Sequence, residues 1–190
     1  MGVSCIFPVL VQVLIHVDES ALGSLDPTGY GGLCRDSSGR WQCGFYGDAG
    51  ITDNLHAELR AIQDGLMIVW RRNFRNVICV YDSLHVVNLV LGSREPFHRY
   101  TTLVVEIKDL LGHEWRTSLM HSLREGNQCM NFLSKWGSNC KSKLVIINDM
   151  LVELRPLLQI VQVFFYLGEF SLFVSSPFTF CLFAMYYQKK

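Results

Sequence analysis

The chain has 190 residues, of which 49% are hydrophobic and only 18% charged. This composition excludes a wholly disordered protein, because disordered chains are poor in apolar residues and rich in charge. Seventeen lysines and arginines balance 17 aspartates and glutamates, so a bound polyanion would be held by local geometry or metal ions rather than by overall charge. The seven cysteines show no CxxC pair and no zinc-ligand spacing, which indicates reduced thiols in an intracellular protein of the nucleus or cytoplasm.

The composition divides the chain into three parts. Residues 1–10 are an N-terminal extension, residues 11–140 hold one domain, and residues 141–190 are a hydrophobic tail, either disordered or membrane-associated. The segment from Phe170 to Tyr187 is uncharged, and about 18 such residues are the lower limit for a membrane-spanning helix. Pro177 would kink that helix. The tail therefore has three interpretations: a membrane anchor, a hydrophobic extension packed on the domain, or read-through sequence without selection.

The first half of the domain begins with strands. Residues 11–17 are mostly apolar and β-branched, which predicts a central strand buried on both faces. Residues 32–35 and 41–46 predict two more strands, joined into an antiparallel hairpin by a turn. Apolar residues then repeat at helical spacing from Leu55 to Val69, and Asp53 or Asn54 can cap the helix that they predict.

The second half alternates between strands and helices. The pattern predicts a strand over 76–81, a helix over 84–91 capped by Asp82 or Ser83, a helix over 100–111, a strand over 114–123, and a helix over 127–136 closed by Gly137. This order predicts an α/β fold: a mixed five-stranded sheet, three strands antiparallel and then two parallel, with helices on both faces.

Three acidic residues stand at matching places in this sheet. Asp18 ends the first strand, Glu58 lies on the inward face of the first helix, and Asp82 ends the fourth strand. If the first and fourth strands are parallel neighbours, their ends share the edge where open α/β sheets bind ligands. Like charges that close repel unless a cation joins them, and oxygen ligands suit Mg²⁺ or Mn²⁺. Each acid alone is more simply explained as a helix cap or a solvated strand end.

The same segments resemble a known family. Residues 18–36 (DESALGSLDPTGYGGLCRD) resemble the opening D-G-S…G-N-P-G-P-x-G-x-G-G-(I/L)-x-R-D of type 1 ribonuclease H, and residues 57–59 (AEL) and 80–83 (VYDS) resemble its helix and strand-end motifs. Residues 121–127 (HSLREGN) resemble the H-V-x-R-E-G-N of plant reverse-transcriptase-associated ribonuclease H-like proteins. The resemblance covers about residues 11–137.

This resemblance implies hydrolysis of the RNA strand of an RNA–DNA hybrid by two Mg²⁺ or Mn²⁺ ions, without a small-molecule cofactor. Asp18, Glu58 and Asp82 match the first three residues of the family's Asp-Glu-Asp-Asp ligand set. Asn131 stands where the fourth acid is expected. His121 matches the histidine that assists proton transfer or product release.

The resemblance also implies contacts with the nucleic acid. Asn54 matches a position that touches the hybrid's minor groove, where the 2′-hydroxyl distinguishes RNA from DNA. Ser20 and Ser83, which lie inside the motifs, are expected to contact nucleic acid as well. Asn54 is equally well explained as the cap of its helix.

Two departures from the family pattern leave two functions open. Asn131 supplies an oxygen but no charge, and Glu19 replaces a glycine while its side chain is expected to alternate away from that of Asp18. The first hypothesis is an active metal-dependent endoribonuclease, and the second is a catalytically weakened or inactive, nucleic-acid-binding relic of a plant retroelement. A membrane-tethered protein is a third and weaker hypothesis, which depends on residues 170–187 alone.

Overall fold

The arrangement of strands follows the predicted order and extends it at both edges. A computed structural model describes residues 12–21, 27–92, 99–121, 128–158 and 172–175. The strands are β1 (Gln12–Ala21), β2 (Thr28–Asp36), β3 (Trp41–Asp48), β4 (Asn76–Tyr81), β5 (Arg116–His121), β6 (Val145–Ile147) and β7 (Leu172–Ser175). The helices are α1 (Asn54–Arg71), α2 (Leu84–Leu91), α3 (Thr101–Leu111) and α4 (Gln128–Asn139), followed by a 3₁₀ turn, η2 (Val152–Leu154).

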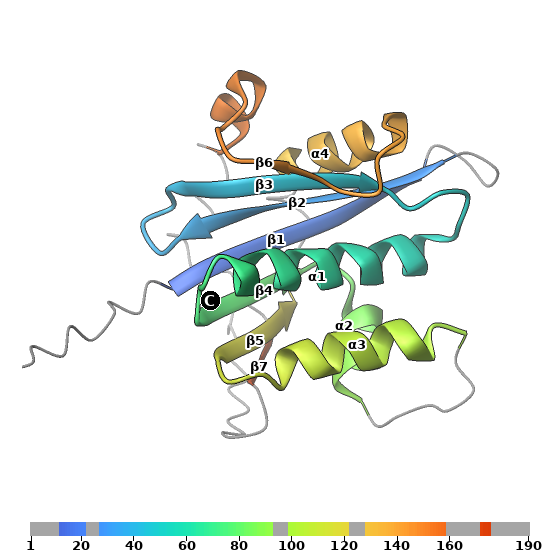
Figure 1. Cartoon of the computed structure of the whole chain (residues 1–190), viewed down its shortest axis with the longest axis vertical. Helices are drawn as coiled ribbons and strands as arrows, with labels where there is room; N and C mark the ends of the chain where they lie inside the picture. Colours follow the sequence, from blue (N-terminus) through green and yellow to red (C-terminus); the bar gives the residue numbers. More distant parts are fainter. Residues whose placement is uncertain (1–11, 22–26, 93–98, 122–127, 159–171, 176–190) are drawn as a thin grey trace, which may run out of the picture.

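The strands form one mixed sheet in the order β6-β3-β2-β1-β4-β5-β7 (Figure 1). The pairs β1–β2 and β2–β3 are antiparallel, whereas β1–β4 and β4–β5 are parallel. The predicted α/β fold with five strands, three antiparallel and then two parallel, is therefore confirmed. The short edge strands β6 and β7, which the sequence did not predict, bring the sheet to seven strands.

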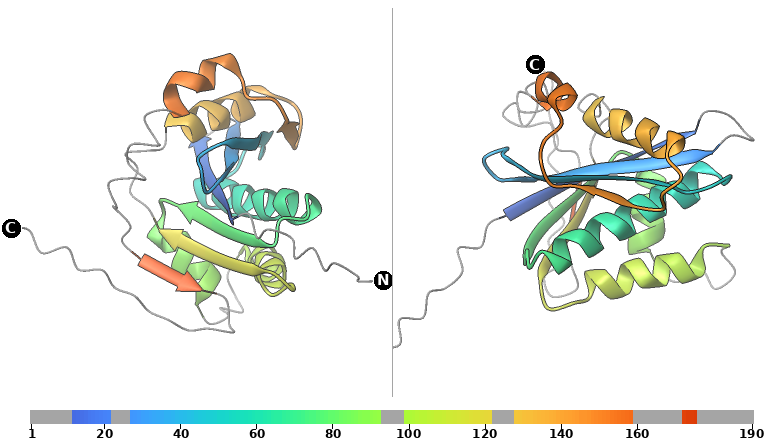
Figure 2. Two further views of the ribbon diagram at one scale, coloured as in Figure 1. Left: turned by 90° about the vertical axis from the view of Figure 1, so that its left-hand side faces the viewer. Right: turned by 45° about the horizontal axis from the view of Figure 1, so that its top comes forward.

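Helices cover both faces of the sheet, as predicted. Figure 2 shows α4 on one side of the strands and α1 on the other. Side chains of β1 alternate between the faces: Val13, Ile15 and Val17 join the core beneath α1 and α3. His16 and Asp18, between them in sequence, therefore point to the face that α4 covers. This alternation decides which side of the sheet each acidic residue can reach.

Helix α4 corrects one prediction, because it does not close at Gly137. The helix continues to Asn139, and Gly137 lies where α4 touches the sheet. A Cβ atom on Gly137 would lie 2.4 Å from the carbonyl oxygen of Gly47 and 2.7 Å from that of Tyr30. Glycine therefore serves close packing at this position rather than helix termination.

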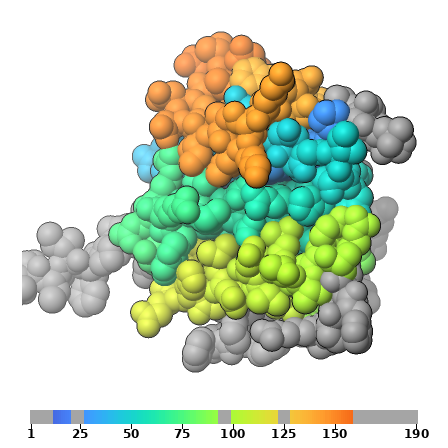
Figure 3. All heavy atoms as spheres, turned by 45° about the vertical axis from the view of Figure 1, so that its right-hand side comes forward, coloured from blue at the N-terminus to red at the C-terminus, as the bar shows by residue number. Residues whose placement is uncertain are grey.

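Part of the predicted tail packs on the domain. Residues 145–147 pair with β3, and Leu154 and Leu158 join a second apolar cluster with Leu33 and Leu133. Figure 3 shows this orange segment lying against the rest of the molecule. For residues 145–158 the packed-extension interpretation therefore describes the structure.

The predictions for the chain ends lie mostly outside the described residues. This holds for residues 1–10 and for most of the segment from Phe170 to Tyr187. Among the described residues, no helix is both long and apolar enough to cross a membrane. The division into extension, domain and tail stays a prediction.

Candidate active site

The acidic residues predicted from the sequence lie at one edge of the sheet. His16 pairs with Val80 in the parallel β1–β4 ladder, and Asp18 and Asp82 each lie two residues farther along the chain. Asp82 directly follows β4, as predicted, but the prediction that Asp18 ends its strand was wrong, because β1 stays paired with β2 as far as Ala21. Glu58 comes from the second turn of α1, and Asp18 and Glu58 are both buried. The parallel pairing explains why residues 64 positions apart share this edge.

Tyr81 lies close to the acidic residues. Its side chain is buried, and burial is the main cause that raises the pKa of its phenol. The negative charges of Glu19, Glu58, Asp82 and Asp18 raise the pKa of Tyr81 further. The four carboxyl groups therefore lie near enough to Tyr81 for their charges to act on its phenol.

Glu19 belongs to this group, although the sequence placed its side chain away from Asp18. The Tyr81 hydroxyl donates a hydrogen bond of 3.3 Å to Glu19 Oε2. The alternation along β1 is retained, and Tyr81 receives Glu19 on the α1 face of the sheet. Glu19 therefore adds a fourth carboxyl group to the edge that carries Asp18, Glu58 and Asp82.

The pKa of Asp18 shows how strongly the site favours a positive charge. Burial raises the pKa of Asp18 from 3.8 to about 8, and the charges of Glu19 and Asp82 contribute to the rise. Without a cation this carboxyl group therefore holds a proton at neutral pH. A divalent cation among these acids would remove the cause of the repulsion.

The acidic side chains are not arranged as a ready metal site, although their charges favour a cation. Within the described ranges, no three histidine, cysteine, aspartate or glutamate side chains are grouped so that they could hold one metal ion. The donor chemistry fits Mg²⁺ or Mn²⁺, because Asp18, Glu58 and Asp82 offer carboxylate oxygens. Binding of such an ion would require at least one of these side chains to turn toward the others.

His121 lies beside the acids, where the motif predicted it. It pairs with Tyr81 across the parallel β4–β5 ladder. Its Nε2 atom lies 3.1 Å from the backbone carbonyl oxygen of Asp82. The half-buried imidazole is therefore held next to the end of β4, within reach of a group bound at the acids.

Asn131 lies on α4, the helix that covers the face of the sheet to which Asp18 points. Phe132 and Trp136 lie on the same helix, and Trp136 packs edge-on against Tyr46 of β3 at 5.8 Å between ring centroids. Asn131 is exposed, and α4 contacts β1 as well as β2 and β3. The position expected for a fourth acid thus lies on the helix that covers the Asp18 face of the sheet, and its role as a metal ligand stays a prediction.

The predicted nucleic-acid contacts have different local roles. Asp53 caps α1, since its Oδ1 accepts a 3.0 Å hydrogen bond from the His56 amide, so the cap explanation for Asn54 was wrong. Asn54 is exposed in the first turn of α1. Ser83, rather than Asp82, caps α2 through the Val86 amide. Ser20 is half-buried on β1.

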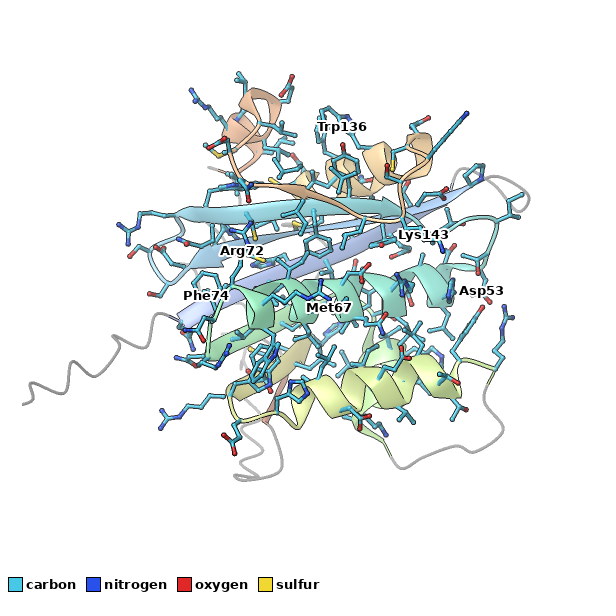
Figure 4. The ribbon with its side chains drawn as sticks, in the orientation of Figure 1. Asp53, Met67, Arg72, Phe74, Trp136 and Lys143 are labelled. Atoms are coloured by element: carbon cyan, nitrogen blue, oxygen red, sulfur yellow. The ribbon has the colours of Figure 1, made fainter. Side chains whose placement is uncertain are left out.

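A cluster near Asn54 was missed by sequence reasoning. Arg99 forms a 2.7 Å ion pair with Asp53, and the Tyr100 hydroxyl donates a 2.7 Å hydrogen bond to the same carboxylate. The Arg99 guanidinium lies 4.5 Å from the Tyr100 ring centre, and His56 stacks on the same ring with 5.2 Å between the ring centres. Figure 4 shows Asp53 at the start of α1. No spacing signal links Arg99 to a helix cap 46 residues earlier.

Comparisons with known proteins identify the family and the fold. A family model described as reverse transcriptase-like matches residues 18–137, more than half of the chain. An Arabidopsis thaliana protein named as a ribonuclease H protein is 26% identical over 129 residues, which are 68% of this chain and 21% of that protein. The chain thus spans about a fifth of the length of this relative.

Solved structures show the same fold. Ribonuclease H1 of the halophilic archaeon Halobacterium salinarum superposes with a TM-score of 0.62 at 19% identity, covering 67% of this chain and 98% of that one. LC11-RNase H1 in complex with an RNA/DNA hybrid gives 0.60 at 20% identity, covering 67% and 96%. The domain therefore has the ribonuclease H fold, and the extent of the family match shows that the chain belongs to the reverse transcriptase-like family.

Proposed function

We propose that this protein is a metal-dependent endoribonuclease that hydrolyses the RNA strand of RNA–DNA hybrids. The observation that carries the proposal is the gathering of Asp18, Glu58 and Asp82 around Tyr81, from three elements far apart in the sequence. Acids collected against one another destabilise a fold, and such perturbed groups concentrate at functional sites. The ribonuclease H fold and the hybrid bound by one solved relative support the choice of substrate.

Asp18, Glu58 and Asp82 would hold two divalent cations, Mg²⁺ or Mn²⁺, and the amide oxygen of Asn131 would add a neutral ligand. Bound ions of this kind supply an activated water and stabilise the charge on the leaving oxygen of a phosphodiester. Before an ion binds, Asp18 holds a proton at neutral pH, because its pKa is raised to about 8. Loss of that proton accompanies formation of the site.

The remaining residues bind and orient the hybrid. His121, held at the Asp82 carbonyl, is placed to pass a proton to the departing RNA oxygen. Asn54, exposed at the start of α1, is placed to contact the 2′-hydroxyl side of the minor groove. Ser20 and the α2 cap Ser83 lie on the elements that carry Asp18 and Asp82, and contact the sugar–phosphate backbone.

Hybrid cleavage tests the proposal. The purified full chain is expected to cut a labelled RNA–DNA hybrid in Mg²⁺, to leave the DNA strand intact, and to stop in a chelator. Asp82→Asn should abolish cutting, whereas Asp109→Asn, at an exposed position of α3, should leave it unchanged. Cutting that is indifferent to Asp82→Asn would overturn the proposal.

A second candidate is a nucleic-acid-binding relic with little or no cleavage. Asn131 favours it, as does the lack of a ready three-residue ligand group among the described side chains. It predicts that the chain binds hybrid in a gel-shift assay with the same affinity in Mg²⁺ and in chelator, and cuts none. Hybrid binding without cleavage would decide for this candidate.

A further inference from the structure

Two cysteines that the proposed function does not use face each other across the β2–β3 hairpin. Cys34 of β2 and Cys43 of β3 are direct partners in the antiparallel ladder. Cα atoms of such partners lie about 4.5–5.5 Å apart. Disulfides span about 4.4–6.8 Å between Cα atoms. A directly paired Cys34 and Cys43 therefore fall within the span of a disulfide, and the register of the two strands shifts only after this pair, between Cys34 and Arg35.

The two thiols also contact each other. The hydrogen bond between them raises the pKa of Cys34 and lowers that of Cys43. The Arg72 guanidinium, labelled in Figure 4, lowers the pKa of Cys43 as well. Arg72 is fixed near this end of β3 because its Nη1 donates to the carbonyl oxygen of Gln42. Cys43 is thus the better nucleophile, with Cys34 as its proton-bearing neighbour.

A third buried thiol, Cys79, is too far away to compete. Ile15 of β1 pairs with Cys34 on one side and with Cys79 on the other. Two strand spacings separate those cysteines, about 9.6 Å. Cα atoms more than about 7 Å apart cannot be bridged without backbone movement. The three thiols also do not form a group that could hold a metal ion, in the part of the chain that is described.

We propose that Cys34 and Cys43 are an oxidisable pair that closes to a cross-strand disulfide when the protein meets a peroxide. The Cys43 thiolate attacks one peroxide oxygen, the O–O bond breaks, and the other oxygen leaves as water. The sulfenic acid so formed is attacked by the Cys34 sulfur, its S–O bond breaks, and a second water leaves with the Cys34 proton. Two thiols lose two electrons and two protons, and the peroxide becomes two waters.

The burial of Cys34 and Cys43 favours a small oxidant over a large one. Both side chains are completely buried in the core beneath α1. A sulfenic acid adds a single oxygen atom to the core, whereas a mixed disulfide with glutathione adds a tripeptide and would require the sheet to open. The pair should therefore respond to hydrogen peroxide much faster than to oxidised glutathione.

Peptide mapping of the full chain tests the proposal. Reduced protein is treated with hydrogen peroxide under native conditions, blocked with N-ethylmaleimide in denaturant, and digested with trypsin without reductant. Cleavage after Arg35 and Arg40 should leave peptide 1–35 linked to peptide 41–60, two hydrogens lighter than the two thiols. Fragment ions distinguish Cys34 from Cys5 within the first peptide.

Variants and a stability measurement complete the test. Cys34→Ser and Cys43→Ser should each abolish the link, whereas Cys79→Ser, the matched buried control, should retain it. The oxidised wild-type protein should melt higher than the reduced protein by roughly 5 °C, because the bridge closes a short loop of the unfolded chain. This readout requires no variant. Sulfinic or sulfonic acid at either cysteine without a link, a link that forms only in denaturant, or oxidation confined to Cys140 would overturn the proposal.

Discussion

Two buried aspartates, Asp18 and Asp64, have opposite surroundings. Burial raises the pKa of both. Around Asp64 on α1 every other neighbour lowers the pKa: Tyr30 donates a hydrogen bond to Oδ2, and an Arg60 nitrogen lies 3.5 Å from the same oxygen. Around Asp18 the nearby carboxyl groups of Glu19 and Asp82 raise the pKa further.

The contrast distinguishes Asp64, which stabilises the fold, from Asp18, which we propose binds a cation. The Tyr30 hydroxyl contacts both Asp64 and the carbonyl oxygen of Lys143, so this network joins α1, β2 and the segment that leads to β6. Its charge is compensated, which suits a group that holds elements together. Around Asp18 the charges of Glu19 and Asp82 instead add to the cost of ionising a buried carboxyl group, and a bound cation would lower that cost.

The largest expected effect comes from removing the charge of Asp18. Asp18→Asn should lower hybrid cleavage by about a hundredfold or more, because the proposed site loses a ligand. The same change should raise the free energy of unfolding by about 1 kcal/mol at neutral pH in the absence of metal, since a neutral amide removes the cost of protonating a buried carboxyl group whose pKa is raised to about 8. Single-turnover cleavage and urea denaturation measure the two effects. A destabilised Asp18→Asn protein would contradict the comparison.

Asp64 should respond in the opposite way. Asp64→Ala should lower the free energy of unfolding by about 3 kcal/mol, because it leaves Tyr30 and Arg60 without their buried partner. Tyr30→Phe should act in the same direction with a smaller loss, of about 1 kcal/mol. Urea denaturation measures both changes. If the folded Asp64→Ala protein lost cleavage as completely as Asp18→Asn, Asp64 would belong to the site.

The pH dependence of stability sharpens the comparison. Asp18 has a pKa of about 8 in the folded chain against 3.8 for the free group, so between these pH values only the folded state keeps the proton. Stability should therefore fall as pH rises through this range, with a slope of up to about 1.4 kcal/mol per pH unit from this group.

Comparison with Asp18→Asn isolates this slope, because Asp64 and His16 also titrate differently in the two states. Urea denaturation from pH 5 to pH 8 in chelator measures the slopes of both proteins. In chelator, the free energy of unfolding should fall more steeply with rising pH for the wild-type protein than for the variant. Saturating Mg²⁺ should reduce this difference. Equal slopes for the two proteins in chelator would show that Asp18 ionises normally.

The smallest expected effect concerns Asn131. Asn131→Asp should raise hybrid cleavage and Mn²⁺ affinity about tenfold, if the missing charge limits the site. Calorimetric titration with Mn²⁺ measures the affinity independently of cleavage. Unchanged affinity would direct attention to Glu19, and Glu19→Gly in the same background would then be expected to restore binding.

The fold was predictable where local pattern and topology agree. The β-branched run in β1 and the apolar repeat of α1 are strong local signals, and the strand order follows from the connections. The shared edge of Asp18 and Asp82 follows from that order. The hydrogen bond between Tyr81 and Glu19 could not be predicted, because it depends on the register of β1 against β4, in which His16 pairs with Val80.

Close backbone packing was the other feature hidden from the sequence. Gly137 carries the signature of a helix end, yet its role depends on β2 and β3, about 90 residues earlier. Strand β6 has three residues, too few for a periodic signal, and it is recognised by its pairing with β3. The cap at Asp53 was among the two predicted candidates, and its carboxylate also accepts a hydrogen bond from the Tyr100 hydroxyl, a partner 47 residues away that no local pattern indicates.

Gly29 and Gly137 set the distance between α4 and the sheet. A Cβ on Gly29 would lie 2.0 Å from the Ser138 amide, as one on Gly137 would lie 2.4 Å from Gly47, so main chain rests on main chain. Because backbone atoms pack directly on backbone atoms here, no side chain can change its rotamer to let α4 move closer or farther away. The distance of α4 from the sheet is therefore preset, and evolution or design can exchange Asn131, the proposed fourth ligand, without moving the helix.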